Sequence, residues 1–171
     1  MNNGIQIMDY TDGDQLQVSE LILHIQQQEY QISITREEQP DLLDIEQYYQ
    51  QGNGNFWVAK DRELVIGTIA LLDIGQQQTA LRKMFVHHEY RGKERKVAYR
   101  LLLEAIRWAR SRQVSDIYLG TTPQFVAAHR FYEKNSFVEI PVGQLPDTFP
   151  VMQVDKKFYH FQIQHVQPLG T

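Results

Sequence analysis

The segment HHEYRGKERKVAYRLL, His87–Leu102, contains the turn on which the fold of this chain depends. Four cations fall within its residues 91–96, although the whole chain carries a formal net charge of −4. They are Arg91, Lys93, Arg95 and Lys96. The pattern predicts a helix start here, and the partly positive amino end of a helix disfavours cations. Charges in a loop are often only solvated, but backbone N–H groups at a strand-to-helix turn also converge on anions. We therefore expect a phosphate-bearing ligand to bind at this turn.

The residues that follow the turn have the spacing of an amphipathic helix. Its apolar positions are Val97, Ala98, Leu101, Leu102, Ala105, Ile106, Trp108 and Ala109, and its polar face carries Arg100, Glu104, Arg107 and Arg110. Thr79–Val86 precedes the turn as a predicted strand, and Ile117–Leu119 follows the helix as a short buried strand. This strand–helix–strand unit over about 79–119 predicts parallel neighbours with a right-handed crossover.

The rest of the chain predicts further strands and helices around this unit. The expected strands are Ile5–Met8, Asn55–Ala59, Leu64–Ile74, Phe137–Ile140 and Phe158–Ile163. Helices are expected from Asp12 to Ile25 with Leu16 on the apolar stripe, over Asp41–Gln51, and over about Pro123–Lys134. The central strands form a meander, which argues for antiparallel pairing. The fold class is thus α/β, with a mixed and mostly antiparallel sheet that carries helices on both faces.

Composition and organisation limit the classes of function. No linker or repeat divides the 171 residues, so we expect one domain over 1–171, with a core over about 4–165 and a short tail over 166–171. The absence of cysteine excludes disulfides, cysteine zinc sites and a thiol nucleophile. No apolar run approaches a membrane span and the start is unlike a signal peptide, so we expect a cytoplasmic chain without a membrane partner. The acidic balance also disfavours nucleic acid as a partner.

Two motifs resemble the GNAT (GCN5-related) N-acetyltransferases. Val86–Lys93, VHHEYRGK, is similar to the strand end that precedes the family's pyrophosphate loop, written Gln/Arg-x-x-Gly-x-Gly/Ala. With Ala98 at the last position of that loop, Lys93 takes the first position and Lys96 stands where the family prefers glycine. Glycine there lets the backbone approach the pyrophosphate closely, and a lysine in helical geometry could still present its N–H.

The second motif is His129–Phe137, HRFYEKNSF, which resembles the family's Tyr-Glu-Lys-x-Gly-Phe ending. Ser136 replaces the glycine of that ending, and Phe125 occupies a position where many members carry Asn. The two motifs occur in the family's order and spacing, and the resemblance spans roughly residues 4–140. It implies the GNAT fold for this chain.

The resemblance implies transfer of an acetyl group from acetyl-CoA to the primary amine of a small molecule or peptide, by direct attack in a ternary complex. It implies that Tyr132 is the acid that protonates the departing thiolate, and that backbone N–H groups of residues 84–86 hold the thioester carbonyl. The coenzyme contacts that it implies are Met84, Phe85, Val86, Arg91, Gly92, Lys93, Glu94, Arg95, Lys96, Val97, Ala98 and Ala128.

Several parts of the site remain open in the sequence. No general base can be assigned, no spacing of carboxylates and histidines suits a catalytic metal, and His129 is expected to be exposed on its helix. Thr121 and Thr122 either line the cleft or cap the next helix. An acidic cluster near the first two helices would suit a cationic amine such as a polyamine or an aminoglycoside; its members are Glu29, Glu37, Glu38 and Asp41.

Two further points about partners stay open as well. The segment 141–165 could pair across a homodimer. A GNAT-fold module that binds acyl-CoA without turnover, or that regulates, is the alternative to an enzyme, and Lys96 and Phe125 favour it. Nucleic-acid binding through the basic face from Arg91 to Arg110 is a third and weaker reading.

Overall fold

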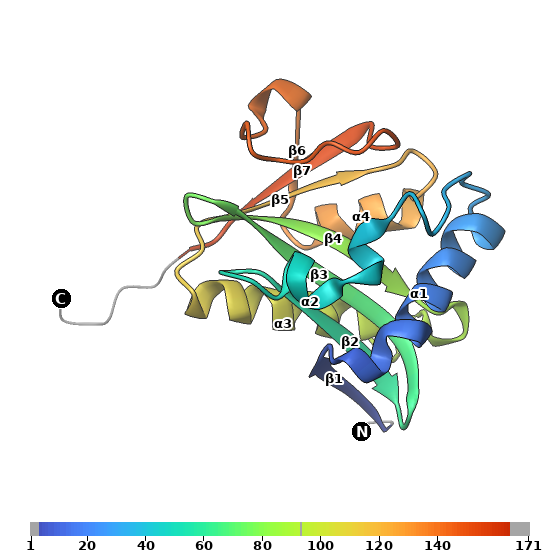
Figure 1. The fold of residues 1–171 in the computed structure, drawn as a ribbon. Helices are drawn as coiled ribbons and strands as arrows, with labels where there is room; N and C mark the ends of the chain where they lie inside the picture. The colour runs from blue at the N-terminus through green and yellow to red at the C-terminus, as the bar shows by residue number, and fades with distance from the viewer. Residues whose placement is uncertain (1–3, 93, 165–171) are drawn as a thin grey trace.

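A computed structural model describes residues 4–92 and 94–164, in which the strands form one mixed sheet (Figure 1). Its seven strands follow the order β1-β2-β3-β4-β5-β7-β6. They are β1 (Ile5–Asp9), β2 (Asn55–Asp61), β3 (Leu64–Gly75), β4 (Gln78–Val86), β5 (Asp116–Thr121), β6 (Val138–Ile140) and β7 (Lys157–Gln162). The β4–β5 pair is parallel and the other pairs are antiparallel. The predicted fold class and parallel crossover are therefore confirmed.

Helices cover both faces of the sheet (Figure 1). The described helical segments are η1 (Asp12–Asp14), α1 (Gln15–His24), the π-helical η2 (Ile25–Glu29), η3 (Pro40–Leu43), α2 (Ile45–Tyr49), η4 (His88–Tyr90), α3 (Val97–Ser111), α4 (Val126–Lys134) and η5 (Val142–Gln144). Strand alternation on β2 sends Phe56 and Val58 into the core beneath α1 and α2, whereas Trp57 and Ala59 pack with α3. None of the helices in the described ranges has the length and hydropathy that a bilayer crossing demands.

Three details of the helices differ from the predictions. The helix expected over Asp41–Gln51 is two short segments. The Asp44 backbone leaves helical geometry, at φ −148° and ψ 66°, and ends η3, and its carboxylate accepts a hydrogen bond from Gln47 N at 3.4 Å to start α2. Leu16 is 60% exposed rather than part of the buried stripe. The last predicted helix begins at Val126 instead of about Pro123, because a turn from Thr122 to Phe125 precedes it.

The sheet divides between β4 and β5. The two strands pair only through Gln78–Ala80 and Asp116–Tyr118, after which they separate. A hydrogen bond holds the two strands together at the end where they pair, because Ser115 N donates to the Gln77 carbonyl at 2.8 Å. Beyond this fork, the facing edges of β4 and β5 form no strand pairs with each other in the described residues. The fork therefore opens a space inside the sheet.

Candidate active site

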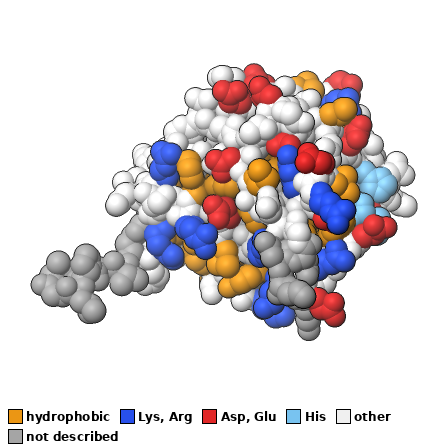
Figure 2. Space-filling model, turned by 90° about the horizontal axis from the view of Figure 1, so that it is seen from below, with side chains coloured by type: hydrophobic (Ala, Val, Ile, Leu, Met, Phe, Trp, Pro, Cys, Tyr) orange, Lys and Arg blue, Asp and Glu red, His pale blue; other side chains and the backbone are white. Residues whose placement is uncertain are grey.

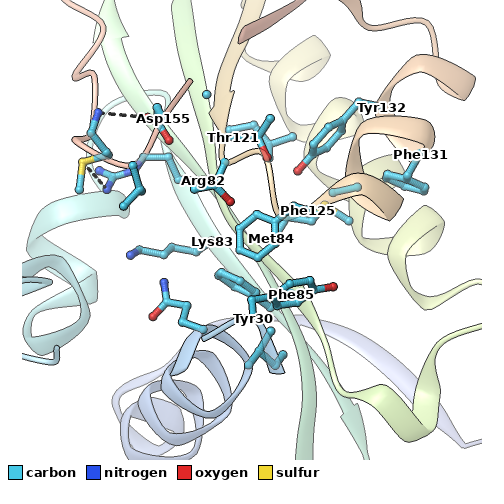
Figure 3. A pocket seen from close by; sticks show the side chains of 18 of the residues that line it. Tyr30, Arg82, Lys83, Met84, Phe85, Thr121, Phe125, Phe131, Tyr132 and Asp155 are labelled. Carbon is cyan, nitrogen blue, oxygen red and sulfur yellow. Dashed lines mark hydrogen bonds between the residues drawn. The ribbon is translucent and has the colours of Figure 1, made fainter. Parts of the chain in front are cut away.

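A cavity of about 350 Å³ lies in the fork between β4 and β5 (Figure 3). Its walls come from β4, from the end of β5 with α4, from η2 and the loop that follows it, and from the loop before β7. The surface is mostly apolar near Met84 and Phe131 and becomes polar near Arg82, Lys83 and Asp155. The cavity thus has an apolar part and a polar end built largely by one strand.

A β-bulge in β4 shapes the polar end. Thr68 pairs with Phe85 and Ala70 with Arg82, so two residues of β4 oppose one residue of β3. Lys83 takes the left-handed conformation at φ 55°, and its carbonyl accepts a 2.6 Å hydrogen bond from the Thr68 hydroxyl. Successive strand residues normally face opposite sides of a sheet. The bulge cancels that alternation and brings Arg82 and Lys83 to the same cavity.

The Lys83 ammonium is buried among polar side chains, with 7% of its side chain exposed. It donates to Gln39 Oε1 at 2.5 Å and lies 3.4 Å from Asp41 Oδ2. The Tyr49 hydroxyl also donates to this carboxylate, at 2.5 Å. Burial lowers the pKa of the Lys83 ammonium to about 8, and the charge of Asp41 opposes part of that effect.

Arg82 lies beside Lys83 with unused hydrogen-bonding capacity. Its Nη2 donates to the Met152 sulfur at 3.5 Å, and its guanidinium carbon lies 5.8 Å from the ring centroids of Tyr48 and Tyr49. Its Nη1 is buried without any hydrogen-bond partner. The nearby Asp155 accepts the backbone N–H of Met152 at 3.1 Å, and burial raises the pKa of its carboxyl group. No described carboxylate forms an ion pair with Arg82.

Tyr132 enters the opposite wall from α4 and turns its hydroxyl toward the cavity (Figure 3). The ring packs against Phe137 and Tyr159, with centroid distances of 5.6 and 5.9 Å. Burial raises the pKa of the Tyr132 hydroxyl well above its ordinary value, so the group is a protonated donor at neutral pH. Among the described residues, none forms a hydrogen bond with this hydroxyl.

His129 is not exposed, contrary to the prediction. It lies on the inner face of α4 at 8% exposure, and its Nε2 is 3.0 Å from the Thr122 carbonyl. Thr121 and Thr122 both line the cavity, and the Thr122 hydroxyl is buried without a partner. His129 thus holds the turn between β5 and α4. Of the two roles predicted for Thr121 and Thr122, they take that of lining the cleft.

The residues predicted to contact a coenzyme are only partly brought together. Met84, Phe85, Val86, Arg91, Ala98 and Ala128 line the cavity. Gly92, Glu94, Arg95 and Lys96 are exposed in the turn before α3, and Val97 is buried in the core. The Arg95 guanidinium lies over the Tyr90 ring, 4.8 Å from its centroid. Lys93 lies outside the described residues.

Lys96 has an unexpected backbone conformation. It precedes α3 at φ 53° and ψ 36°, in the left-handed region rather than in helical geometry. This region disfavours side chains with a Cβ and suits glycine. The structure therefore explains why glycine would fit this position.

Arg91 connects the turn to the other side of the cavity. Its Nη2 lies 2.7 Å from Glu29 Oε1, and its Nε donates to the Val86 carbonyl at 2.8 Å. Glu29 thus belongs to an ion pair. Glu38 is exposed and accepts from Thr35 N at 3.1 Å, and Asp41 is buried beside Lys83. Glu37 is exposed, so the four carboxylates have different surroundings, and the cationic acceptor that they suggested stays a prediction.

Three cavity residues were not predicted from the sequence, namely Arg82, Gln39 and Asp155. One signal was present: Arg82 and Lys83 are consecutive cations inside the otherwise apolar stretch Ala80–Val86. Gln39 and Asp155 lie in irregular segments, and no periodic pattern assigns such segments to a site.

Comparisons with known proteins agree on one family. Residues 19–137 match the sequence profile of the acetyltransferase (GNAT) family. A crystal structure of a GNAT-family acetyltransferase from Staphylococcus aureus Mu50 is 38% identical with a TM-score of 0.90, covering 94% of this chain and 99% of that one. An acetyltransferase from Streptococcus agalactiae 2603 is 31% identical with a TM-score of 0.89 at the same coverage. N-acetylaspartate synthetase from Xenopus tropicalis is 38% identical over 104 residues, which are 60% of this chain and only 38% of that protein.

Proposed function

The chain belongs to the GNAT acetyltransferase family, and on this premise we propose that it transfers an acetyl group from acetyl-CoA to a primary amine. The observation that carries the proposal is the forked cavity, which has a protonated tyrosine on one wall and the amino end of α3 at its edge. The amine would be part of a small molecule or a peptide.

The coenzyme's diphosphate would bind at the turn before α3. The first N–H groups of a helix have no partner within it, and those of Val97, Ala98 and Tyr99 occupy this position. Arg91 and Lys96 add positive charge nearby, and the small side chains of Ala98 and Ala128 leave room along the cavity wall. This accounts for cations at a helix start, because a bound anion reverses the sign of their interaction.

The chemistry would proceed at the fork. The amine nitrogen attacks the thioester carbonyl carbon, the carbon–sulfur bond breaks, and the amine loses a proton while the thiolate gains one. Tyr132 would donate the proton that the sulfur gains, the proton lost by the amine would pass to solvent water, and the tyrosinate would then regain a proton from solvent. Backbone N–H groups of the segment from Met84 to Val86 would stabilise the negative charge that develops on the carbonyl oxygen.

Release of the CoA thiol tests this function. The protein is incubated with acetyl-CoA and a panel of amines that includes amino acids, polyamines and a peptide amine, and thiol is followed colorimetrically. Amine-dependent release supports the enzyme. Tight CoA binding without release for every amine would support the alternative, a GNAT-fold module that binds acyl-CoA without turnover.

The remaining sequence-based predictions concern partners and location. The homodimer and the cytoplasmic location stay predictions. In the face shown in Figure 2, Lys and Arg side chains are interspersed with Asp and Glu rather than gathered in one continuous field. Such a mixed surface gives little support to nucleic-acid binding, which relies on a basic patch or stripe.

A further inference from the structure

The polar end of the cavity contains more hydrogen-bond donors than acceptors. Arg82 carries five N–H donors, of which the buried Nη1 has no acceptor. Lys83 carries three N–H donors, of which Gln39 accepts one and Asp41 lies within reach of another. The Thr122 hydroxyl is also buried without a partner in the same lining. A buried donor left unsatisfied costs free energy, so this end of the cavity favours a ligand that accepts hydrogen bonds.

Asp41 and Asp155, the carboxylates beside the two cations, already accept hydrogen bonds from the protein. Asp41 accepts from the Tyr49 hydroxyl and lies beside Lys83. Asp155 accepts from Met152 N, and its raised pKa reflects a buried position that favours the neutral form. Glu29 lies outside the cavity lining, where its Oε1 pairs with Arg91 and its Oε2 is buried without a hydrogen-bond partner. A cationic acceptor would therefore meet two cations of β4 at the polar end, where Asp41 and Asp155 already accept hydrogen bonds from protein donors.

The two cations are also positioned to act together. The bulge at Lys83 directs both side chains to the same cavity, and Figure 3 shows them extending in the same general direction, away from Tyr132. The Tyr48 and Tyr49 rings lie against the Arg82 guanidinium, and the Thr68 hydroxyl fixes the Lys83 backbone. A planar guanidinium whose Nη1 has no hydrogen-bond partner, beside an ammonium, matches the geometry of a carboxylate.

We propose that the acceptor is an amine that also carries a carboxylate, such as an amino acid, and that Arg82 and Lys83 bind this carboxylate at the polar end of the cavity. The inference rests on the proposed acetyl transfer and names its class of acceptor. Binding of the carboxylate by Arg82 and Lys83 would leave the amine to face the middle of the cavity, toward Tyr132.

Matched pairs of acceptors test the proposal. Each pair is an L-amino acid and its primary amide, which differ in the carboxylate charge but keep the same side chain. The amide has the less basic amine and hence more of the reactive free base, so this bias works against the proposal. We expect kcat/KM to favour the acid by about 10- to 100-fold, as for a charge-assisted hydrogen bond. A wild-type preference for amides or for polyamines would overturn the proposal.

Variants of Arg82 test which group binds the carboxylate. Arg82→Gln should bring the acid-to-amide ratio of kcat/KM close to one, and Arg82→Lys should restore part of the preference. Because the ratio is taken within one preparation, it does not depend on the fraction of protein that folds. Arg110→Gln, a change of an exposed cation at the far end of α3, should leave the ratio unchanged. An unchanged ratio in Arg82→Gln would contradict the proposal.

A binding measurement separates this inference from the proposed function. Calorimetry on CoA-loaded protein compares each acid with its amide without requiring turnover. If no amine releases thiol but acids bind more tightly and Arg82→Gln abolishes the difference, the acetyl transfer fails and the carboxylate site stands. If thiol is released but acids and amides bind and react equally, the transfer stands and the carboxylate site fails.

Discussion

Tyr132 is the residue whose hydroxyl is best placed to give up a proton in the cavity. It forms no hydrogen bond with the other described residues, and burial keeps its pKa high. Both properties keep the hydroxyl protonated at neutral pH, so that a proton is available when negative charge develops on the leaving sulfur. In this role Tyr132 would contact only the sulfur of the bound coenzyme.

Tyr132→Phe removes this donor and little else. We expect kcat to fall by about 100-fold, within the range of general acid catalysis, while the Kd for CoA stays the same. Tyr159→Phe is the matched control, because its ring packs on Tyr132 but its hydroxyl donates to Glu133 at 2.6 Å. The control should lose some thermal stability and keep its kcat. A Tyr132→Phe enzyme with full kcat would remove Tyr132 from the acid role.

Lys96 shows how a single backbone angle affects stability. A residue with a Cβ in the left-handed region lowers the free energy of unfolding by roughly 1–2 kcal/mol. Glycine removes this penalty but loses about 0.5–1 kcal/mol through its greater conformational freedom in the unfolded chain. We expect Lys96→Gly to raise the Tm by about 2 °C and to leave CoA affinity equal or tighter.

Arg107→Gly provides the comparison for Lys96→Gly within the same helix. Arg107 is exposed in the regular part of α3, so glycine there should lower stability by about 1 kcal/mol. Thermal melts and CoA calorimetry measure both variants. A large loss of CoA affinity in Lys96→Gly would mean instead that the Lys96 ammonium contacts a phosphate.

At the scale of elements, the bulged strand β4 determines the polar end of the cavity. Its distortion is held by the 2.6 Å bond from the Thr68 hydroxyl to the Lys83 carbonyl. Without this bond a regular β4 would send Arg82 and Lys83 to opposite faces. The site therefore depends on a residue of β3 that does not line the cavity.

Thr68→Val keeps the side-chain shape and leaves the Lys83 carbonyl without its donor. We expect a loss of about 1–3 kcal/mol in the free energy of unfolding and a clear fall in kcat/KM. Thr79→Val is an unusually close control, since Thr79 is also fully buried in the sheet but its hydroxyl has no partner. That variant should be neutral or more stable in a denaturant titration. Equal losses in both variants would show that the bulge does not depend on Thr68.

The elements differ in how well the sequence predicts them. Long periodic stretches such as Val97–Ser111 and Leu64–Gly75 were predicted with nearly correct ends, because an apolar period reports directly on burial. The ends of the helices in the segment 41–51 were not predicted, because Asp44 interrupts the helix through a cap that composition alone does not reveal. The bulge at Lys83 was also missed, since its cause is a hydrogen bond from another strand.

The candidate site divides in the same way. The turn before α3 and the position of Tyr132 could be predicted because local motifs carry them. The polar end could not, because Gln39, Arg82 and Asp155 come from three distant segments and meet only in the folded chain. His129 was expected on the surface, although the inner face of α4 buries it against Thr122.

At the scale of the whole molecule, one ion pair spans the cavity. Glu29 at the end of η2 holds Arg91 in the turn after β4, with 2.7 Å between Oε1 and Nη2. The pair therefore connects the helices on one face of the sheet to the turn that precedes the helix on the other face. A bound diphosphate near this turn would compete with Glu29 for the Arg91 guanidinium.

Arg91→Gln separates the anchoring of the diphosphate from the chemistry at the thioester. We expect the affinity for CoA to fall about 10-fold, as for one charge-assisted hydrogen bond, while the KM for a short pantetheine thioester changes little. Arg107→Gln removes an exposed cation farther along α3 and should change neither value. Equal losses for CoA and for the short thioester would show that Arg91 does not meet the diphosphate.

The length of the unpaired edge of β4 also limits which acyl donors fit the cavity. From Lys83 at the bulge to Val86, the free edge of β4 extends roughly 10 Å at the usual rise per strand residue, and η4 and the turn before α3 follow it. An acyl donor whose diphosphate binds at the turn before α3 needs a linker of matching length for its thioester to lie at the bulge. Length is thus a selection criterion that the protein imposes through the backbone of β4.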